Sequence, residues 1–296
     1  MNAGGASERG HDGPGYLTAL RAGLDEMTRP DSVAVSVWCA RVGRRPAFRY
    51  DADRDHYAAS LIKLPVLIAA HRRLDLDTQL VVHEEFRSVV GRGLRYRADR
   101  EYDNDEEPWL LLGRTAPLRW LCHRMICASS NLATSLVLEA VGLDRAAAFA
   151  PRGMTLTRPI GDRPAVIDGR TNTVTAAAAG ALVSALAGLP GPESRRLLAP
   201  LRDQRFTDEI PAALPAGTRT ANKNGWVDGV LHDVALIEAA DAPAYVLAVC
   251  TSGLPEDRAR VAIHAVARAS WEDRHCLGAP PHREPNPRSP VNAHTP

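Results

Sequence analysis

The sequence predicts a mixed α/β (α+β) fold, in which a five-stranded antiparallel sheet is flanked by terminal helices and interrupted by an inserted all-α lobe. Three observations lead to this fold class. Segments of β-rich alternation lie near both ends of the chain, the middle is mostly helical, and an amphipathic helix stands at each end. Because the outer segments share one β character, we expect them to join in one sheet with the helical middle as an insertion.

The elements follow in a simple order. Apolar positions recur at helical spacing near the start and stop before Pro30, and a β-hairpin is expected around Gly43. The expected elements are a helix over 16–29, strands over 33–40 and 47–50, helices from 60 to about 187, strands over 218–224, 230–238 and 245–251, and a helix over 255–273.

A length of 296 residues fits one large domain or two interleaved lobes. We expect a flexible N-terminus over 1–15 and a single domain over 16–275. Its sheet lobe comprises 16–57 and 190–275, and its helical lobe comprises 58–189. The segment 276–296 is rich in proline and poor in apolar residues, which predicts a disordered tail.

The composition argues against several classes of function. A formal net charge of +1 provides no electrostatic reason to expect nucleic acid or an anionic membrane as a partner. Searches for a phosphate-binding loop, a Gly-x-Ser-x-Gly elbow and a His-Glu-x-x-His motif find none, so we expect no cofactor and no metal. The expected partner is a small-molecule substrate, and the expected state is a monomer.

The start of the chain lacks the pattern of a secretory signal, and the stretch 176–189 is too short and too rich in small residues to span a membrane. Five scattered cysteines are an odd number, which favours free thiols in a reducing compartment. We therefore expect a cytoplasmic protein.

Lysine is the most informative residue type, because only two of the 36 lysine and arginine residues are lysines. They are Lys63, in the run Ser60-Leu61-Ile62-Lys63, and Lys223, which opens Lys223-Asn224-Gly225. A buried amine can lose its proton, whereas the guanidinium of arginine cannot. A GC-rich coding sequence that favours arginine is the plain alternative, but it does not explain a serine three residues before one of two lysines.

Ser60 and Lys63 stand three residues apart at an expected helix start, so that both lie on one face and the amine can reach the hydroxyl. This is a pair of nucleophile and base. The free N–H groups of a helix N-terminus suit an oxyanion. A surface helix with a capping serine is the alternative, but the residues on both sides of the pair are apolar, which favours burial.

Two further segments complete a set of three. Ser129-Ser130-Asn131 interrupts a helical run, and Lys223-Asn224-Gly225-Trp226 lies in an expected strand whose glycine allows close approach of a ligand. In order, the three segments match the Ser-x-x-Lys, Ser-Asp-Asn and Lys-Thr-Gly motifs. The chain thus resembles the class A β-lactamase-related serine hydrolases, within the β-lactamase and penicillin-binding-protein superfamily, over about residues 16–275. The stretches 118–142 and 223–237 look most like intracellular-type actinobacterial members.

The resemblance implies a β-lactamase-like fold and a role for each motif residue. Ser60 would be the acylated nucleophile, Lys63 the base, Ser129 the proton shuttle to the leaving nitrogen, and Lys223 an electrostatic support. Asn131 would bind the substrate and Lys63. Asn224, Gly225 and Trp226 would border the substrate, with the backbone N–H groups of Ser60 and Trp226 as the oxyanion hole.

Three departures from the family pattern matter. Ser130 replaces an acid, which is expected to cost a structural hydrogen bond, and Asn224 replaces the threonine that helps to hold a substrate carboxylate. No glutamate occurs between Glu139 and Glu193, where a class A enzyme carries its deacylating acid. Asp162 and Asp168 are the acids available in that stretch, and Asp162 is preferred because it follows a flexible Ile160-Gly161 turn.

Three other groups of residues could suggest a metal site or a different catalytic arrangement. The acidic segment Asp99 to Trp109 could suggest calcium, but it lacks the glycine and terminal glutamate of an EF-hand, so we expect a solvated loop that borders the cleft. Cys122, His123 and Cys127 could suggest zinc, but they lie in an apolar helical pattern. Asp55-His56 permits a Ser-His-Asp arrangement, although a surface turn before the nucleophile is favoured.

The sequence therefore predicts a serine hydrolase that acts on a β-lactam or another amide or ester through an acyl-enzyme on Ser60. Two alternatives stay open. One is acyl transfer to an amine in small-molecule biosynthesis, which a missing deacylating acid would favour. The other is a binding or sensor protein of the same fold without turnover.

Overall fold

The computed structural model describes residues 15–278. The predicted flexible N-terminus and proline-rich tail therefore lie, apart from residues 15 and 276–278, outside the described residues. Over residues 15–278 no helix has the length and apolar character needed to cross a membrane.

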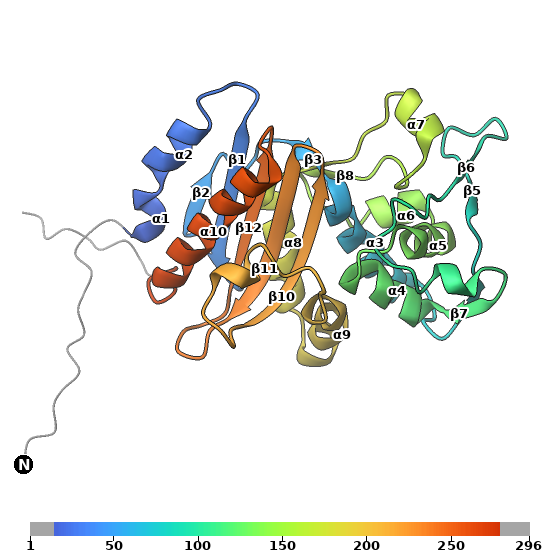
Figure 1. The fold of residues 1–296 in the computed structure, drawn as a ribbon. Coiled ribbons are helices and arrows are strands. Elements are labelled where there is room, and N and C mark those ends of the chain that lie inside the picture. The colour runs from blue at the N-terminus through green and yellow to red at the C-terminus, as the bar shows by residue number, and fades with distance from the viewer. Residues whose placement is uncertain (1–14, 279–296) are drawn as a thin grey trace, which may run out of the picture.

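A single antiparallel sheet of five strands forms the centre of one lobe, as predicted (Figure 1). The strand order is β10-β11-β12-β1-β2, so strands from the two ends of the chain are neighbours. The hairpin partners β10 and β11 pair in a register that places Gly225 opposite His232. The strands are β1 (Ala34–Arg41), β2 (Phe48–Tyr50), β10 (Arg219–Val227), β11 (Val230–Glu238) and β12 (Tyr245–Ser252).

Terminal helices cover the outer face of this sheet (Figure 1). They are α1 (Tyr16–Ala19), α2 (Arg21–Met27) and α10 (Glu256–Glu272). Alternate strand residues such as Val35, Val37 and Leu247 pack there with Ile263 and Val266 in one apolar core. The carboxylate of Asp273 accepts hydrogen bonds from the first backbone N–H groups of α1, which joins the two ends of the fold.

The inner face of the sheet packs on α8 (Ala176–Ala187), which the sequence assigned to the helical lobe. In the structure α8 belongs with the sheet, so the boundary of the sheet lobe lies before α8 and not after it. Gly180 makes this packing possible, because it lets the ring of Trp38 lie directly against the helix. A Cβ at Gly180 would come within 2.2 Å of that ring. One continuous apolar core runs from this face into the helical lobe, so the two lobes share their interior.

The helical lobe surrounds α3, whose residues 63–70 are all buried. Its helices are α3 (Lys63–Arg73), α4 (Leu118–Cys127), α5 (Asn131–Val141), α6 (Leu143–Ala147) and α7 (Arg163–Ile167). The helix α9 (Gly191–Arg202) contacts both β10 of the sheet and α4 of this lobe. The lobe is not entirely helical, because three small antiparallel sheets brace its loops. Their strands are β3 (His56–Tyr57), β4 (Gln79–Val81), β5 (Glu85–Arg87), β6 (Arg95–Arg97), β7 (Thr115–Pro117), β8 (Met154–Thr155) and β9 (Thr173–Val174). Short 3₁₀ turns are η1 (Ala59–Ile62), η2 (Trp109–Leu111) and η3 (Pro211–Ala213).

Candidate active site between the lobes

Ser60 lies in η1, the turn that leads into α3, and its side chain is half-buried. The preceding residue, Ala59, has a φ of +45°, in the left-handed region that a residue with a Cβ rarely adopts. Such a conformation costs about 1–3 kcal/mol and is found mostly where function requires it. The backbone at Ser60 is therefore held by its surroundings.

Ser129, between α4 and α5, connects Ser60 to both lysines. Its hydroxyl donates to Ser60 Oγ at 3.1 Å and accepts from Lys63 Nζ and Lys223 Nζ, each at 3.1 Å. Ser129 is fully buried and, like Ala59, has a positive φ, of +52°. These contacts form a continuous chain of hydrogen bonds. A proton can move along it from the nucleophile to an amine once the hydroxyl groups turn, so that Ser60 donates to Ser129 and Ser129 donates to the amine.

Lys63 was expected to contact Ser60 directly, but the structure joins the two residues through the hydroxyl of Ser129. Lys63 Nζ donates to the carbonyl oxygen of Ser129 at 2.6 Å and to Asn131 Oδ1 at 2.9 Å. The amine is thus turned toward the second motif, and the hydroxyl of Ser129 stands between it and the nucleophile. Lys63, Ser129 and Asn131 come together as predicted, with a different order of contacts.

Both lysines are fully buried, and neither makes an ion pair with any residue that the structure describes. Burial, together with the nearby ammonium of Lys223, holds the pKa of Lys63 well below its usual range. Burial lowers the pKa of Lys223 to about 7, against the opposing effect of Asp233 and Glu209. An amine with a pKa of about 7, such as that of Lys223, can exchange protons at neutral pH.

Gly225 brings the edge strand β10 against the nucleophile. A Cβ at this position would lie 2.8 Å from Ser60 N and 3.2 Å from Ala59 Cβ, so only glycine fits without a shift of the backbone. The next residue, Trp226, packs its ring on Phe206 with centroids 5.0 Å apart. This arrangement brings the backbone of β10 next to that of Ser60, as the proposed oxyanion hole requires.

The acidic segment is more than a solvated loop. The carboxylate of Asp103 accepts from the backbone N–H groups of Asn131 and Leu132 at 2.9 and 2.8 Å, at the start of α5. Asp105 is buried and forms a bidentate ion pair with Arg124 of α4. The expectation of a solvated loop was therefore wrong for these two acids, because they anchor the helices on both sides of Ser129.

The same segment touches the second motif directly. The side chain of Asn131 donates to the carbonyl oxygen of Tyr102 at 2.7 Å, while the ring of Tyr102 is 79 % exposed. The segment thus positions Asn131 at the edge of the seam, the region between the lobes where Ser60, Lys63, Ser129 and Lys223 meet.

Ser130 and Asn224, the two residues that differ from the family motifs, have structural roles. Ser130 is the N-cap of α5, accepting from Ala133 N at 3.1 Å and donating to Asp103 at 3.2 Å. The side chain of Asn224 is buried and donates to Glu209 Oε2 at 3.3 Å, and its Oδ1 lies 3.5 Å from Lys223 Nζ. Asn224 therefore connects Lys223 to an acid, whereas its expected contact with substrate stays a prediction.

Asp162 and Asp168, the candidate deacylating acids, lie in different surroundings. Asp162 is buried, and its carboxylate accepts from Ser88 Oγ, Val89 N and Ala165 N at 2.8, 2.9 and 3.1 Å. It caps α7 and attaches it to the neighbouring loop. Asp168 is exposed and pairs with Arg170 at 3.1 Å. None of these contacts involves the residues around Ser60.

The alternative arrangements do not join the nucleophile. The ring nitrogens of His56 lie 2.7 Å from Ser252 Oγ and 2.8 Å from Ser36 Oγ, and none of its hydrogen bonds involves Ser60. The expected surface turn was wrong for His56, because this residue is buried in β3. Cys127 Sγ lies 3.3 Å from His123 Nδ1. Within residues 15–278, no three metal-ligating side chains are arranged to hold an ion.

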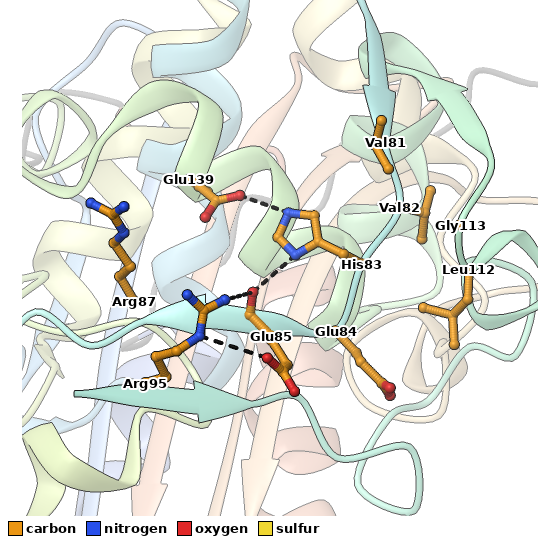
Figure 2. A pocket seen from close by; sticks show the side chains of 10 residues that line it. All are labelled: Val81, Val82, His83, Glu84, Glu85, Arg87, Arg95, Leu112, Gly113 and Glu139. Atoms are coloured by element: carbon orange, nitrogen blue, oxygen red, sulfur yellow. Dashed lines mark hydrogen bonds and ion pairs between the residues drawn. The ribbon is translucent and has the colours of Figure 1, made fainter. Parts of the chain in front are cut away.

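A surface pocket on the helical lobe is separate from this seam (Figure 2). In it, His83 lies between Glu139 Oε2, at 2.9 Å, and the carbonyl oxygen of Glu85, at 3.0 Å. Arg95 pairs with Glu85. Several of the charged groups in this pocket therefore pair with one another. The pocket contains none of the residues that are hydrogen-bonded to Ser129. It is lined by Val81, Val82, His83, Glu84, Glu85, Arg87, Arg95, Leu112, Gly113 and Glu139.

Sequence reasoning missed two acids near the active site, Glu209 and Asp233, and it placed Asp103 at the cleft only as part of the acidic segment. For Asp233 a signal was present, since His232 and Asp233 are polar residues inside an otherwise apolar strand. Asp103 stands in a run of acids in which no local feature singles it out.

The fold agrees with comparisons to known proteins. Solved β-lactamases from Sphaerobacter thermophilus (26 % identity, TM-score 0.68, covering 90 % of this chain and 97 % of that one) and Xanthomonas campestris pv. campestris (20 %, 0.69, 88 % and 98 %) are similar. PBP-A is similar too, at 18 % identity and a TM-score of 0.66 over 86 % and 96 % of the two chains. No curated protein matched.

The family model described as "Beta-lactamase enzyme family" matches residues 19–273, which include every motif residue of the seam. With the three motifs meeting at Ser129 in a fold shared with these structures, the chain belongs to the β-lactamase enzyme family.

Proposed function

We propose that this β-lactamase-like hydrolase cleaves a β-lactam or another amide or ester through an acyl-enzyme on Ser60. The observation that carries the proposal is the convergence of Ser60 and two buried amines on the hydroxyl of Ser129. A nucleophile joined to a base of lowered pKa is the arrangement that covalent catalysis requires.

The contacts suggest the order of proton transfers. Ser129 takes the proton of Ser60 as Ser60 Oγ attacks the carbonyl carbon, and passes its own proton to the neutral amine of Lys63. When the bond to the leaving group breaks, the proton returns through Ser129 to the departing nitrogen or oxygen. Backbone N–H groups of Ser60 and Trp226 would stabilise the oxyanion.

The second step, release of the acyl group, is expected to be slow. The carboxylate of Asp162 is occupied by three donors and Asp168 is exposed and ion-paired. Lys63, acting again as base, is then the remaining candidate to activate water. A slow second step also supports the alternative function, transfer of the acyl group to an amine. One solved structure of a PBP-A variant is an acyl-enzyme with penicillin G.

Intact-mass spectrometry tests the proposal. The full chain is mixed with penicillin G and, separately, with simple activated esters, and quenched at intervals. We expect a covalent adduct that peptide mapping places on Ser60, with a burst of product followed by a slow phase. The Ser60→Ala variant is the control. No adduct with any reagent would contradict the proposal, and rapid penicillin turnover without an adduct would contradict slow release.

The cytoplasm is the proposed location. It is supported by the five cysteines, all of which are free and four of which are buried.

A further inference from the structure

Two amines compete for one acceptor at the centre of the site. Lys63 Nζ and Lys223 Nζ each lie 3.1 Å from Ser129 Oγ, in a region without bulk water. Two ammonium groups so close would repel each other strongly, because burial weakens dielectric screening. The protein is therefore expected to hold one proton fewer than two free lysines would, and something must decide which amine keeps it.

Asp233 of β11 is the acid that most strongly opposes the loss of the Lys223 proton, since it raises the pKa of Lys223 against the effect of burial. It is fully buried, and each of its oxygens accepts a hydrogen bond: Oδ2 from Ile210 N at 3.0 Å and Oδ1 from Asn222 Nδ2 at 3.1 Å. Burial and then the neighbouring Glu209 raise the pKa of Asp233 to about 7, while the two fixed donors and Lys223 act in the opposite direction and favour the ionised form. The register places Asp233 opposite Asn224, the neighbour of Lys223.

Glu209 provides a second acid through a chain of hydrogen bonds. Its Oε2 accepts from Asn224 Nδ2 at 3.3 Å, and Asn224 accepts from Lys223 Nζ, at 2.8 Å through its carbonyl oxygen and at 3.5 Å through Oδ1. Arg260 lies 3.7 Å from the other oxygen of Glu209. The amide of Asn224 thus joins the amine to a carboxylate that is 4 % exposed.

The charged and titratable groups around the two amines differ. Lys223 is influenced by Asp233, Glu209 and Cys127. Lys63 is influenced by the ammonium of Lys223 and by one acid, Asp103. Asp103 is already engaged by two backbone N–H groups and the indole of Trp109.

We propose that Asp233, held by Asn222, and Glu209, held by Asn224, are positioning residues that keep Lys223 as the ammonium and leave Lys63 as the neutral amine. Neither acid touches the nucleophile, so their effect passes through Lys223. This assignment also gives Asn224 a role, since its side-chain amide accepts from Lys223 through Oδ1 and donates to Glu209 through Nδ2. The use of the neutral amine as the base rests on the proposed function, whereas the charge assignment does not.

The two lysines make a direct measurement practical. Protein labelled with ¹³C at lysine Cε has two resonances, one from each lysine in the chain, which Lys63→Arg and Lys223→Arg assign. Titration of the full chain should show Lys223 holding its proton to higher pH than Lys63. The reverse order in the wild-type protein would overturn the proposal without any variant or substrate.

Asp233→Asn removes the charge while keeping the shape. We expect the Lys223 midpoint to fall by about one pH unit or more, and the Lys63 midpoint to rise because its neighbour is then less charged. Glu209→Gln should produce a smaller change in the same directions. Unchanged midpoints in folded Asp233→Asn would overturn the role of Asp233.

A charge swap separates electrostatics from packing. The double variant Asn222→Asp with Asp233→Asn returns a carboxylate to the same hydrogen-bonded pair, so both midpoints should return toward their wild-type values. It gives up the bond from Asn222 to the carbonyl oxygen of Phe206. Its melting temperature should therefore stay below that of the wild type while its titration recovers, and a failure of the midpoints to recover would count against a charge effect.

Labelling kinetics separate a failure of the proposed function from a failure of the charge assignment. If an acylating agent labels Ser60, Asp233→Asn should shift the acid limb of the labelling rate to higher pH, because Lys63 must be neutral to act as base. If no agent labels the protein, the proposed function fails and the titration still decides the charge assignment.

Discussion

The seam at Ser129 and the loop attached by Asp162 both bury ionisable groups, yet they do opposite things with them. Asp162 receives three donors, two of them backbone N–H groups, so that its carboxylate is fully satisfied in one geometry. Lys63 and Lys223 instead share a hydroxyl that rotates and that reaches Ser60. A buried charge with fixed partners holds structure together, whereas buried amines that compete for one movable hydroxyl are poised for proton transfer.

The backbone differs between the two regions in the same sense. Ala59 and Ser129 have positive φ values next to the reacting groups, whereas Asp162 caps α7 with an ordinary φ of −70°. Left-handed backbone therefore adjoins the reacting groups directly, whereas the helix cap itself does not need it. Apart from glycines, the loop held by Asp162 has such a residue only at Arg92, with a φ of +55°.

Replacing the base, Lys63, should cause the largest loss of activity at the active site. We expect Lys63→Arg to lower the rate at which an acylating agent labels Ser60 by about 10²- to 10⁴-fold, because arginine keeps the charge and cannot accept the proton. Labelling is followed by intact mass, and circular dichroism checks that the variant is folded. Full labelling in the arginine variant, or an adduct mapped to another serine, would remove the mechanism.

Two glycines separate alignment from packing. Gly225→Ala should lower the acylation rate by about 100-fold, because its Cβ would push β10 away from Ser60 N. Gly180→Ala is the matched control, since its Cβ would press on Trp38 in the core. That variant should lose about 1–3 kcal/mol of unfolding free energy while its folded fraction acylates normally. Equal loss of activity in both variants would show that packing alone accounts for Gly225.

Acid should weaken the sheet beneath the nucleophile. Burial lowers the pKa of His56 to about 3 and that of His232 to about 4. His232 Nε2 donates to the carbonyl oxygen of Tyr57, and Nδ1 accepts from Thr251 N, so a second proton has no acceptor. Above the unfolded-state pKa of about 6.5, both states are neutral and nothing is lost.

As pH falls below that value, His56 and His232 bind protons in the unfolded chain but stay neutral in the folded chain. Stability should then drop by about 2 kcal/mol per histidine at pH 5. Urea unfolding of the wild type and of His232→Gln at pH 7.5 and pH 5 checks this. An equal drop in both proteins would show that His232 does not contribute.

The smallest expected effects concern the two aspartates of the loop. Asp162→Asn should lower the free energy of unfolding by about 1–3 kcal/mol, since an amide cannot accept from all three donors. Asp168→Asn should cost at most about 1 kcal/mol, because its ion pair is exposed. Release of the acyl group should be little changed in either variant. A large slowing of release in Asp162→Asn, beyond its loss of stability, would restore Asp162 as the deacylating acid.

The sequence by itself determined the five strands, the terminal helices and the three motifs, because alternation, helical spacing and a scarcity of lysine are local properties that need no knowledge of the fold. Gly225 could be identified in the same way, as a glycine two residues after a lysine at the end of an expected strand. The position of α8 on the sheet could not, because an apolar, alanine-rich helix fits either lobe.

Only the tertiary structure decided which groups meet. Ser129 stands 66 residues from Lys63 and 94 from Lys223, and its place between them depends on how α4, α5 and β10 pack. The same holds for the acids: Asp162, the preferred candidate in the sequence, is a helix cap, whereas Asp103, Glu209 and Asp233 lie beside the seam. A carboxylate looks alike in any loop of the sequence, and its role follows from the donors that folding brings to it.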